Sequence, residues 1–123
     1  MAKHILIVDD TYDILYLMRM MLEEHHHQVS VLDVGAPVVE FVRVNRPDLI
    51  ILDLRLTDIS GITVLRELKA DPDTSSVPVI AYTASMGDAD KVTALITGDP
   101  ERYGDTRVLR KPFAIDELLN IVA

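Results

Sequence analysis

The stretch Pro47-Asp48-Leu49-Ile50-Ile51-Leu52-Asp53 decides the fold, because four consecutive aliphatic residues end at one carboxylate. A short, unbroken apolar run after a proline is typical of a strand buried on both faces. Such strands belong to parallel sheets that are covered by helices. Asp53 then lies at the carboxyl end of the sheet, where open α/β folds place their chemistry. An unpaired buried acid is strongly unfavourable, so we expect other residues to compensate its charge.

Further apolar runs and amphipathic segments alternate along the chain. Strands are predicted at residues 5–8, 29–32, 49–52, 77–82 and 107–109, and helices at 11–26, 36–45, 62–70, 89–97 and 114–122. Asp10 or Thr11 could cap the first helix, and Ser60 the third. Strict alternation of strands and helices gives a parallel sheet with right-handed crossovers. The predicted fold is α/β, a doubly wound five-stranded parallel sheet in a flavodoxin-like (βα)5 three-layer sandwich. Residues 1–123 are expected to form one domain, with no output domain in the chain.

Composition narrows the function classes. The chain has 123 residues, a net charge of −8 and no cysteine. The negative charge argues against direct binding of nucleic acid or an anionic membrane surface, although a basic partner stays open. The lack of cysteine excludes disulfides, thiol chemistry and Cys-ligated zinc. No apolar run approaches the length of a membrane span, and no signal-peptide region precedes the first strand. A cytoplasmic location is the default expectation.

Polar residues stand where the predicted strands end. Asp9 and Asp10 follow the first strand, Asp53 ends the third, Thr83 follows the fourth, and Lys111 comes shortly after the fifth. Three carboxylates in one crevice repel and raise one another's pKa, and a divalent cation and a lysine relieve that repulsion. Mg²⁺ prefers a few carboxylates together with water and phosphate oxygens. A metal, an ammonium, a hydroxyl and a free carboxylate are the parts that phosphoryl transfer needs. A carboxylate can accept the phosphoryl group covalently.

Taken in order and spacing, these motifs resemble the receiver domain of two-component response regulators over the whole chain. The matching pieces are Ile7-Val8-Asp9-Asp10, Asp48-Leu49-Ile50-Ile51-Leu52-Asp53, Gly61, Pro78-Val79-Ile80-Ala81-Tyr82-Thr83-Ala84 and Lys111-Pro112-Phe113. The resemblance implies Mg²⁺-dependent transfer of a phosphoryl group to Asp53 from a sensor histidine kinase or a histidine phosphotransfer protein. It also implies that the chain promotes only its own phosphorylation and dephosphorylation and is not otherwise an enzyme.

The resemblance assigns further roles. It implies that Asp10 and Asp53 bind Mg²⁺, that Asp9 helps through water, and that the backbone carbonyl of Arg55 completes the protein ligands. It implies that Thr83, Lys111 and the backbone N–H of Ala84 contact the phosphoryl group. The added charge, roughly two negative charges at neutral pH, would bias a surface of the fourth strand, fourth helix and fifth strand. The expected output is a changed affinity for a downstream protein target. A homodimer through the fourth helix, fifth strand and last helix stays open.

Several positions depart from the family pattern. Val108 replaces the aromatic residue usual three positions before the lysine, and Tyr82 or Tyr103 could substitute for it. Thr57 replaces a proline four residues after the aspartate that the family phosphorylates. Residues 97–104 lengthen the connection before the fifth strand, and we hypothesise a specialised partner surface there. Arg55 and Ser85 flank the site, where by resemblance such residues tune the lifetime of the phosphoryl group.

The adjacent histidines His25-His26-His27 invite a metal interpretation. Neighbouring residues point in different directions around a helix, so these side chains do not converge as a pair four residues apart would. Their partial positive charge suits the carboxyl end of a helix. We therefore predict that they end the first helix.

Three alternative functions fit the sequence less well. An aspartyl-phosphate phosphohydrolase resembling the haloacid dehalogenase type needs a second acid two residues after the nucleophile, where this chain has Arg55. A flavin-binding electron carrier needs a hydroxyl- and glycine-rich phosphate loop, and Asp9-Asp10 would repel phosphate without a metal. A degenerate receiver acting as an unphosphorylated scaffold is disfavoured by the full set of acids with Thr83 and Lys111, although Val108 leaves room for an altered switch.

Overall fold

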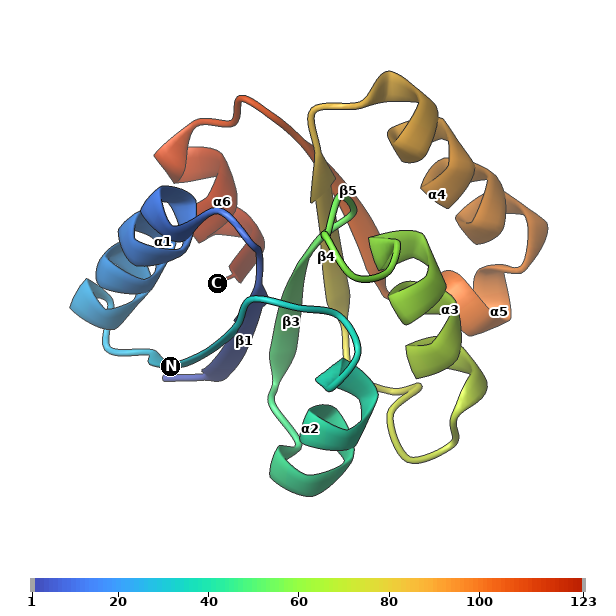
Figure 1. The fold of residues 1–123 in the computed structure, drawn as a ribbon, viewed down its shortest axis with the longest axis horizontal. Coiled ribbons are helices and arrows are strands. Elements are labelled where there is room, and N and C mark those ends of the chain that lie inside the picture. Colours follow the sequence, from blue (N-terminus) through green and yellow to red (C-terminus); the bar gives the residue numbers. More distant parts are fainter. Residues whose placement is uncertain (1, 123) are drawn as a thin grey trace.

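Five parallel strands form one sheet in the order β2-β1-β3-β4-β5 (Figure 1). The structure is a computed structural model that describes residues 2–122. The strands are β1 (His4–Val8), β2 (Gln28–Leu32), β3 (Leu49–Asp53), β4 (Val79–Thr83) and β5 (Thr106–Arg110). The chain runs from β1 to one edge of the sheet and then returns to β3 on the other side of β1. The topological switch point therefore lies between β1 and β3, beside Asp9 and Asp53.

Helices cover both faces of the sheet, which confirms the predicted flavodoxin-like three-layer fold (Figure 1). One face is packed by α1 (Tyr12–Glu24) and α6 (Ile115–Val122). The other is packed by α2 (Val38–Asn45), α3 (Gly61–Ala70), α4 (Met86–Gly98) and the short α5 (Pro100–Tyr103). Along β3, Ile50 and Leu52 point to the α2–α5 layer, whereas Leu49 and Ile51 point to α1 and α6. Both faces of the strand are buried, so its sequence shows no polar alternation.

The connection between β4 and β5 differs most from the prediction. Helix α4 begins at Met86, three residues earlier than expected, because the Ser85 side chain accepts a hydrogen bond from the backbone N–H of Asp88 (3.2 Å). The helix ends at Gly98, one residue later than predicted. The following segment forms α5, an additional short helix that the sequence pattern did not indicate. Tyr103 at its end is only 5% exposed and packs in the α2–α5 core.

The ends of the other helices bear on the predicted caps. Ser60 caps α3, as expected, by accepting a hydrogen bond from the N–H of Ile62 (3.2 Å). Thr11 occupies the N-cap position of α1, but no side-chain capping bond forms there, so this part of the prediction is wrong. Helix α1 ends at Glu24 and His25 lies at its C-cap, so the histidine triplet ends the helix as predicted.

Candidate functional site

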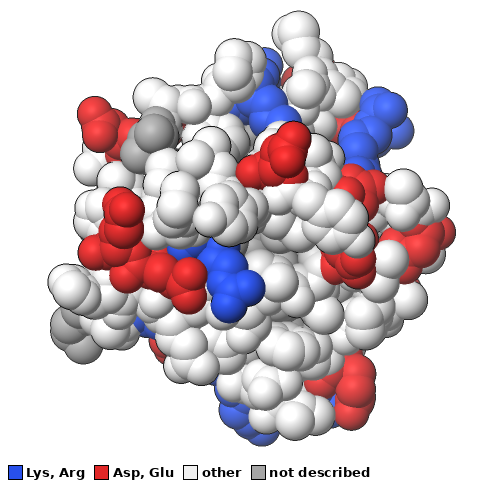
Figure 2. All heavy atoms as spheres, turned by 60° about the vertical axis from the view of Figure 1, so that its left-hand side comes forward, with Lys and Arg blue, Asp and Glu red and all other residues white. Residues whose placement is uncertain are grey.

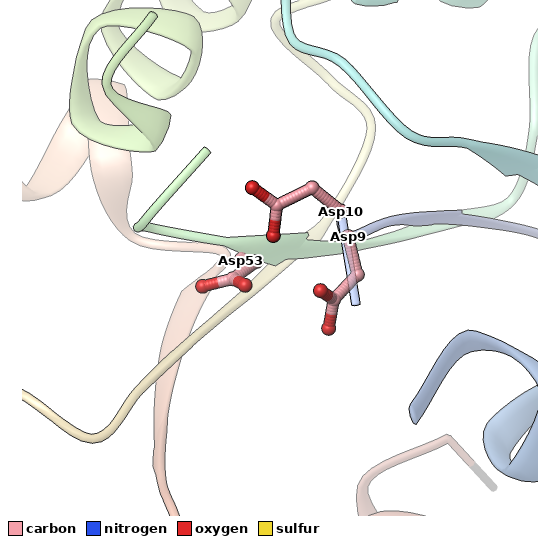
Figure 3. A group of neighbouring side chains, drawn as sticks. All are labelled: Asp9, Asp10 and Asp53. Carbon is pink, nitrogen blue, oxygen red and sulfur yellow. The ribbon is translucent and has the colours of Figure 1, made fainter. Parts of the chain in front are cut away.

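Three carboxylates meet at the switch point of the sheet. Val8 pairs with Leu52, so the residues that follow β1 lie beside the last residue of β3. One side-chain oxygen from each of Asp9, Asp10 and Asp53 lies within 4.8 Å of the others (Figure 3). Asp9 and Asp53 are buried and Asp10 is half-buried. The structure thus brings together the acids that were predicted from the strand ends.

The Asp53 carboxylate has two positive neighbours that only partly offset its burial. Its Oδ1 accepts a hydrogen bond from the backbone N–H of Arg55 (2.9 Å), and its Oδ2 lies 3.5 Å from Nζ of Lys111. Burial, together with the negative charge of Asp9, raises the pKa of Asp53 to about 6, against the effect of the Arg55 N–H and the Lys111 ammonium. A single lysine therefore leaves the cluster short of positive charge.

Asp9 is fully buried, and both of its oxygens accept hydrogen bonds. The backbone N–H of Thr11 donates to Oδ1 (2.8 Å), and the hydroxyl of Tyr82 donates to Oδ2. Burial, with the adjoining carboxylate of Asp9, raises the pKa of Tyr82 far above its usual range, so the phenol stays protonated and can donate. The Lys111 ammonium lies 4.4 Å from the centre of the same ring. Tyr82 was predicted as a strand residue and as a possible substitute for the missing aromatic, and its contacts with Asp9 and Lys111 were not predicted.

The other predicted site residues lie at the ends of β4 and β5, beside the acids. Thr83 is buried, and its Oγ1 accepts a hydrogen bond from the N–H of Ser85 (3.0 Å). The backbone N–H of Lys111 donates to the carbonyl of Thr83 (2.8 Å), which ties the end of β5 to the end of β4. A cleft of about 420 Å³ opens above these residues. Its lining comprises Asp10, Thr11, Asp53, Arg55, Ala84, Ser85 and Lys111.

Two features hold the loop that follows β3. A side chain at Gly61 would place its Cβ 2.3 Å from the backbone oxygen of Asp53, so only glycine fits there. The guanidinium of Arg55 pairs with Asp88 in the first turn of α4 (2.7 Å). This ion pair bridges the loop to α4 beside the cleft, so the side chain of Arg55 has a partner other than the Asp53 carboxylate.

Val108 and the histidines lie outside this constellation. Val108, on β5, is half-buried and packs against the α2–α5 core. A ring nitrogen of His25 lies 3.0 Å from the carbonyl of Met21, and Nδ1 of His27 accepts a hydrogen bond from the N–H of Lys3 (3.1 Å). Among residues 2–122, the three aspartates form a group of potential metal-binding side chains, and these histidines are not part of it.

The donor set fits a hard divalent cation. Carboxylate oxygens are the ligands that Mg²⁺ prefers, and the cleft beside them leaves room for water and for a phosphoryl group. Burial is the main cause of the raised pKa of Asp53 and the charge of Asp9 a smaller one, and a dication would offset both by stabilising the ionised carboxylate. The residues present are therefore compatible with a magnesium site.

Charged side chains are dispersed over one face of the molecule (Figure 2). On the face drawn in Figure 2, Lys and Arg side chains lie apart from one another among acidic and uncharged ones. Such a face lacks the clustered positive charge that nucleic-acid binding requires. Across residues 2–122, none of the helices combines the length and apolar character needed to cross a bilayer.

Known proteins resemble the chain over nearly its full length. A family model described as the response regulator receiver domain matches residues 5–123. Protein PilH of Pseudomonas aeruginosa is 34% identical over 118 residues, which cover 96% of this chain and 93% of that protein. The receiver domain of a signal transduction histidine kinase from Syntrophus aciditrophicus superposes with a TM-score of 0.82 at 32% identity, covering 98% of this chain and 87% of that one. The receiver domain of a Pseudomonas aeruginosa sensor histidine kinase, with a magnesium ion coordinated in its active site cleft, gives 0.79 at 30% identity, covering 99% and 95%.

Proposed function

The chain belongs to the response regulator receiver family of two-component signalling, and we propose that it accepts a phosphoryl group on Asp53 and changes its partner affinity in response. The observation that carries this proposal is the position of Asp53. It ends a fully buried strand, faces a cleft, and has Lys111 Nζ at 3.5 Å and the oxygens of two further acids within 4.8 Å. The proposed donors are a sensor histidine kinase or a histidine phosphotransfer protein. Residues 1–123 are proposed to form one receiver domain in the cytoplasm, where ATP supplies such kinases.

The proposed reaction is a transfer between two protein side chains. A carboxylate oxygen of Asp53 attacks the phosphorus atom of a phosphohistidine. The new O–P bond forms as the P–N bond breaks, and the imidazole leaves and takes up a proton. The Lys111 ammonium stabilises the phosphoryl oxygens as negative charge develops on them. Little covalent chemistry is required of other residues, because such transfer depends mainly on positioning and charge neutralisation.

Asp9, Asp10, Asp53 and the backbone carbonyl of Arg55 would hold the Mg²⁺ ion, with Asp9 acting through water. When bound, the ion supplies charge neutralisation at the phosphoryl oxygens. The protein's own contribution is to hold the acids together. Asp53 is fixed by the Arg55 N–H and Lys111, and Asp9 by the N–H of Thr11. This fixed geometry lowers the reorganisation that ion binding would otherwise require.

The proposed response begins at Thr83. Its hydroxyl, which now accepts a hydrogen bond from the N–H of Ser85, can instead donate to a phosphoryl oxygen on Asp53. Lys111 and the backbone N–H of Ala84 are the other proposed contacts. Ser85 caps α4, so movement of Thr83 reaches the start of that helix directly. Because Val108 has no ring to rotate, this route through Ser85 is proposed to carry the signal to the α4–β5 surface and its protein target.

The site disfavours the rival functions. Arg55 stands where a phosphohydrolase would need its second acid, and its guanidinium is paired with Asp88. The proposed activity is therefore confined to the chain's own phosphorylation and dephosphorylation. The net charge of −8 supports a protein partner over nucleic acid. A homodimer through α4, β5 and α6 is a further possibility, which sedimentation measurements of the molecular mass would test.

Incubation with Mg²⁺ and acetyl phosphate, followed by intact mass measurement, tests the proposal. Wild type is expected to gain one phosphoryl group, and EDTA is expected to prevent the gain. Asp53→Asn should gain none. Asp48→Asn is the matched control, because it removes the same charge from an exposed residue just before the same strand. Absence of any adduct on wild type, with acetyl phosphate and with a histidine kinase, would instead favour the unphosphorylated scaffold.

A further inference from the structure

Tyr82 connects two parts of the site that the sequence places far apart. Residues 9 and 82 are separated by 73 positions, yet the Tyr82 hydroxyl donates to Oδ2 of Asp9. The ring of the same residue lies beneath the Lys111 ammonium, 4.4 Å from Nζ to the ring centre. One side chain thus touches both a proposed metal-binding acid and the proposed phosphoryl-binding cation.

The position of Tyr82 in the sheet explains these contacts. Tyr82 pairs with Asp53 across β3 and β4 and with Leu109 across β4 and β5. It lies one residue before Thr83, so the alternation of a strand turns its side chain away from the Thr83 side and toward α1 and α6. The ring meets Phe113 edge-on, with centres 6.2 Å apart. Such packing restricts the ring to one orientation, and the hydroxyl is held at Asp9.

The Tyr82 hydroxyl stabilises the buried carboxylate of Asp9 by a hydrogen bond. The carboxylate of Asp9 is 0% exposed, and a buried charge requires hydrogen bonds to replace those of water. The N–H of Thr11 donates a hydrogen bond to Oδ1 of Asp9, and the Tyr82 hydroxyl donates one to Oδ2. Because Asp10 and Asp53 repel Asp9, its carboxylate would turn away from them if it lost one of these donors. Donors of this kind orient metal-binding acids in general.

We propose that Tyr82 is a positioning residue of the magnesium and phosphoryl site: its hydroxyl fixes the carboxylate of Asp9, and its ring seats the ammonium of Lys111. The inference rests on the proposed function and goes beyond it by assigning a role to a residue outside the predicted set. The hydroxyl governs how tightly Mg²⁺ binds. The ring governs where Lys111 meets the transferring group, through the attraction between a cation and an aromatic face.

Two substitutions separate the hydroxyl from the ring. Tyr82→Phe keeps the ring, and with it the contacts to Phe113 and Lys111. Tyr82→Leu removes both the hydroxyl and the ring. Tyr12→Phe is the matched control, because the Tyr12 hydroxyl also donates to an aspartate, Asp33 (2.9 Å), at an exposed position of α1. Mg²⁺ affinity is measured by calorimetry, and the initial rate of phosphorylation by acetyl phosphate is measured over a range of Mg²⁺ concentrations.

We expect Tyr82→Phe to weaken Mg²⁺ binding by about tenfold, as for other residues that orient metal ligands. Its phosphorylation rate at saturating Mg²⁺ should stay within about twofold of wild type, since the Lys111 ammonium keeps its contact with the aromatic ring. Tyr82→Leu should weaken Mg²⁺ binding similarly and also lower the saturated rate by about tenfold. Tyr12→Phe should change neither quantity. A purely structural role would lower thermal stability without this separation of affinity from rate.

The outcomes distinguish the inference from the function on which it rests. A wild-type protein that binds no Mg²⁺ would overturn the proposed function. A wild type that binds Mg²⁺, with a Tyr82→Phe variant of equal or higher affinity, would overturn the inference alone. If that variant does not fold, carbon-13 NMR of the wild-type tyrosine ring carbons decides, with lines assigned by elimination from the other Tyr→Phe variants. The Tyr82 line should then shift on Mg²⁺ addition, and an unchanged line would overturn the inference.

Discussion

Replacing Asp53 with asparagine should stabilise the magnesium-free protein. The carboxylate of Asp53 is buried beside two other acids, and among residues 2–122 its one ion pair is with Lys111. Asparagine has nearly the same shape, and its side-chain oxygen can still accept the hydrogen bond from the N–H of Arg55. The substitution therefore removes an unfavourable charge while leaving the packing intact.

The size of the effect follows from the pKa of Asp53. Raising that pKa from 3.8 to about 6 is equivalent to about 3 kcal/mol of unfolding free energy at neutral pH. The cleft is open to water, and screening reduces the expected gain to about 1–2 kcal/mol. The sign follows from the folded state holding its proton more tightly than the unfolded chain. Wild type thus loses stability, relative to the variant, as the pH rises through about 4 to 6, and the difference is constant above that range.

Urea unfolding followed by circular dichroism, in EDTA and over a series of pH values, measures the difference. Asp90→Asn is the matched control, because it removes one negative charge from an exposed position of α4. Added Mg²⁺ should narrow or reverse the difference, since each tenfold of concentration above the dissociation constant stabilises wild type by about 1.4 kcal/mol. Equal stability of wild type and Asp53→Asn at neutral pH, or a difference that grows on acidification, would refute the reasoning.

Three further substitutions test the fold and the site. The ammonium of Lys69 is fully buried and donates hydrogen bonds to two backbone carbonyls and to the carboxylate of Asp105. Lys69→Met should therefore lower the free energy of unfolding by about 3 kcal/mol in urea titrations. A loss below about 1 kcal/mol would contradict this expectation. Gly61→Ala should cost about 2 kcal/mol, because the new Cβ meets the Asp53 backbone, whereas Gly98→Ala meets nothing and should be tolerated; equal melting temperatures would count against the argument. Lys111→Met should slow phosphorylation by acetyl phosphate by about tenfold to a hundredfold, and an unchanged rate would remove Lys111 from the reaction.

The sheet and the acid cluster could be predicted because they depend on strong local signals. The run Leu49–Leu52 has no polar interruption, since β3 is covered on both faces. The carboxyl ends of parallel strands lie at one edge, so residues at strand ends converge whatever their separation in sequence. Those two facts were enough to bring Asp9, Asp10 and Asp53 together.

The features that the sequence analysis missed depend on contacts between distant residues or on weak local signals. Gly87 follows Ser85 closely and obscured the start of α4, which the Ser85 cap determines. Helix α5 has four residues between Asp99 and Gly104, too few for any periodicity, and is anchored by burial of Tyr103. The hydrogen bond from Tyr82 to Asp9 could not be predicted, because the two residues are 73 positions apart in the sequence.

The most direct test of the central claim locates the phosphoryl group on the chain. Protein phosphorylated with acetyl phosphate and Mg²⁺ is treated with borohydride, which reduces an acyl phosphate to the alcohol and so converts an aspartyl phosphate to homoserine. Peptide mass spectrometry then identifies the converted residue. The account predicts homoserine at position 53 and none at positions 9 or 10. Conversion at another aspartate, or retention of aspartate at 53 in protein whose intact mass shows the adduct, would contradict it.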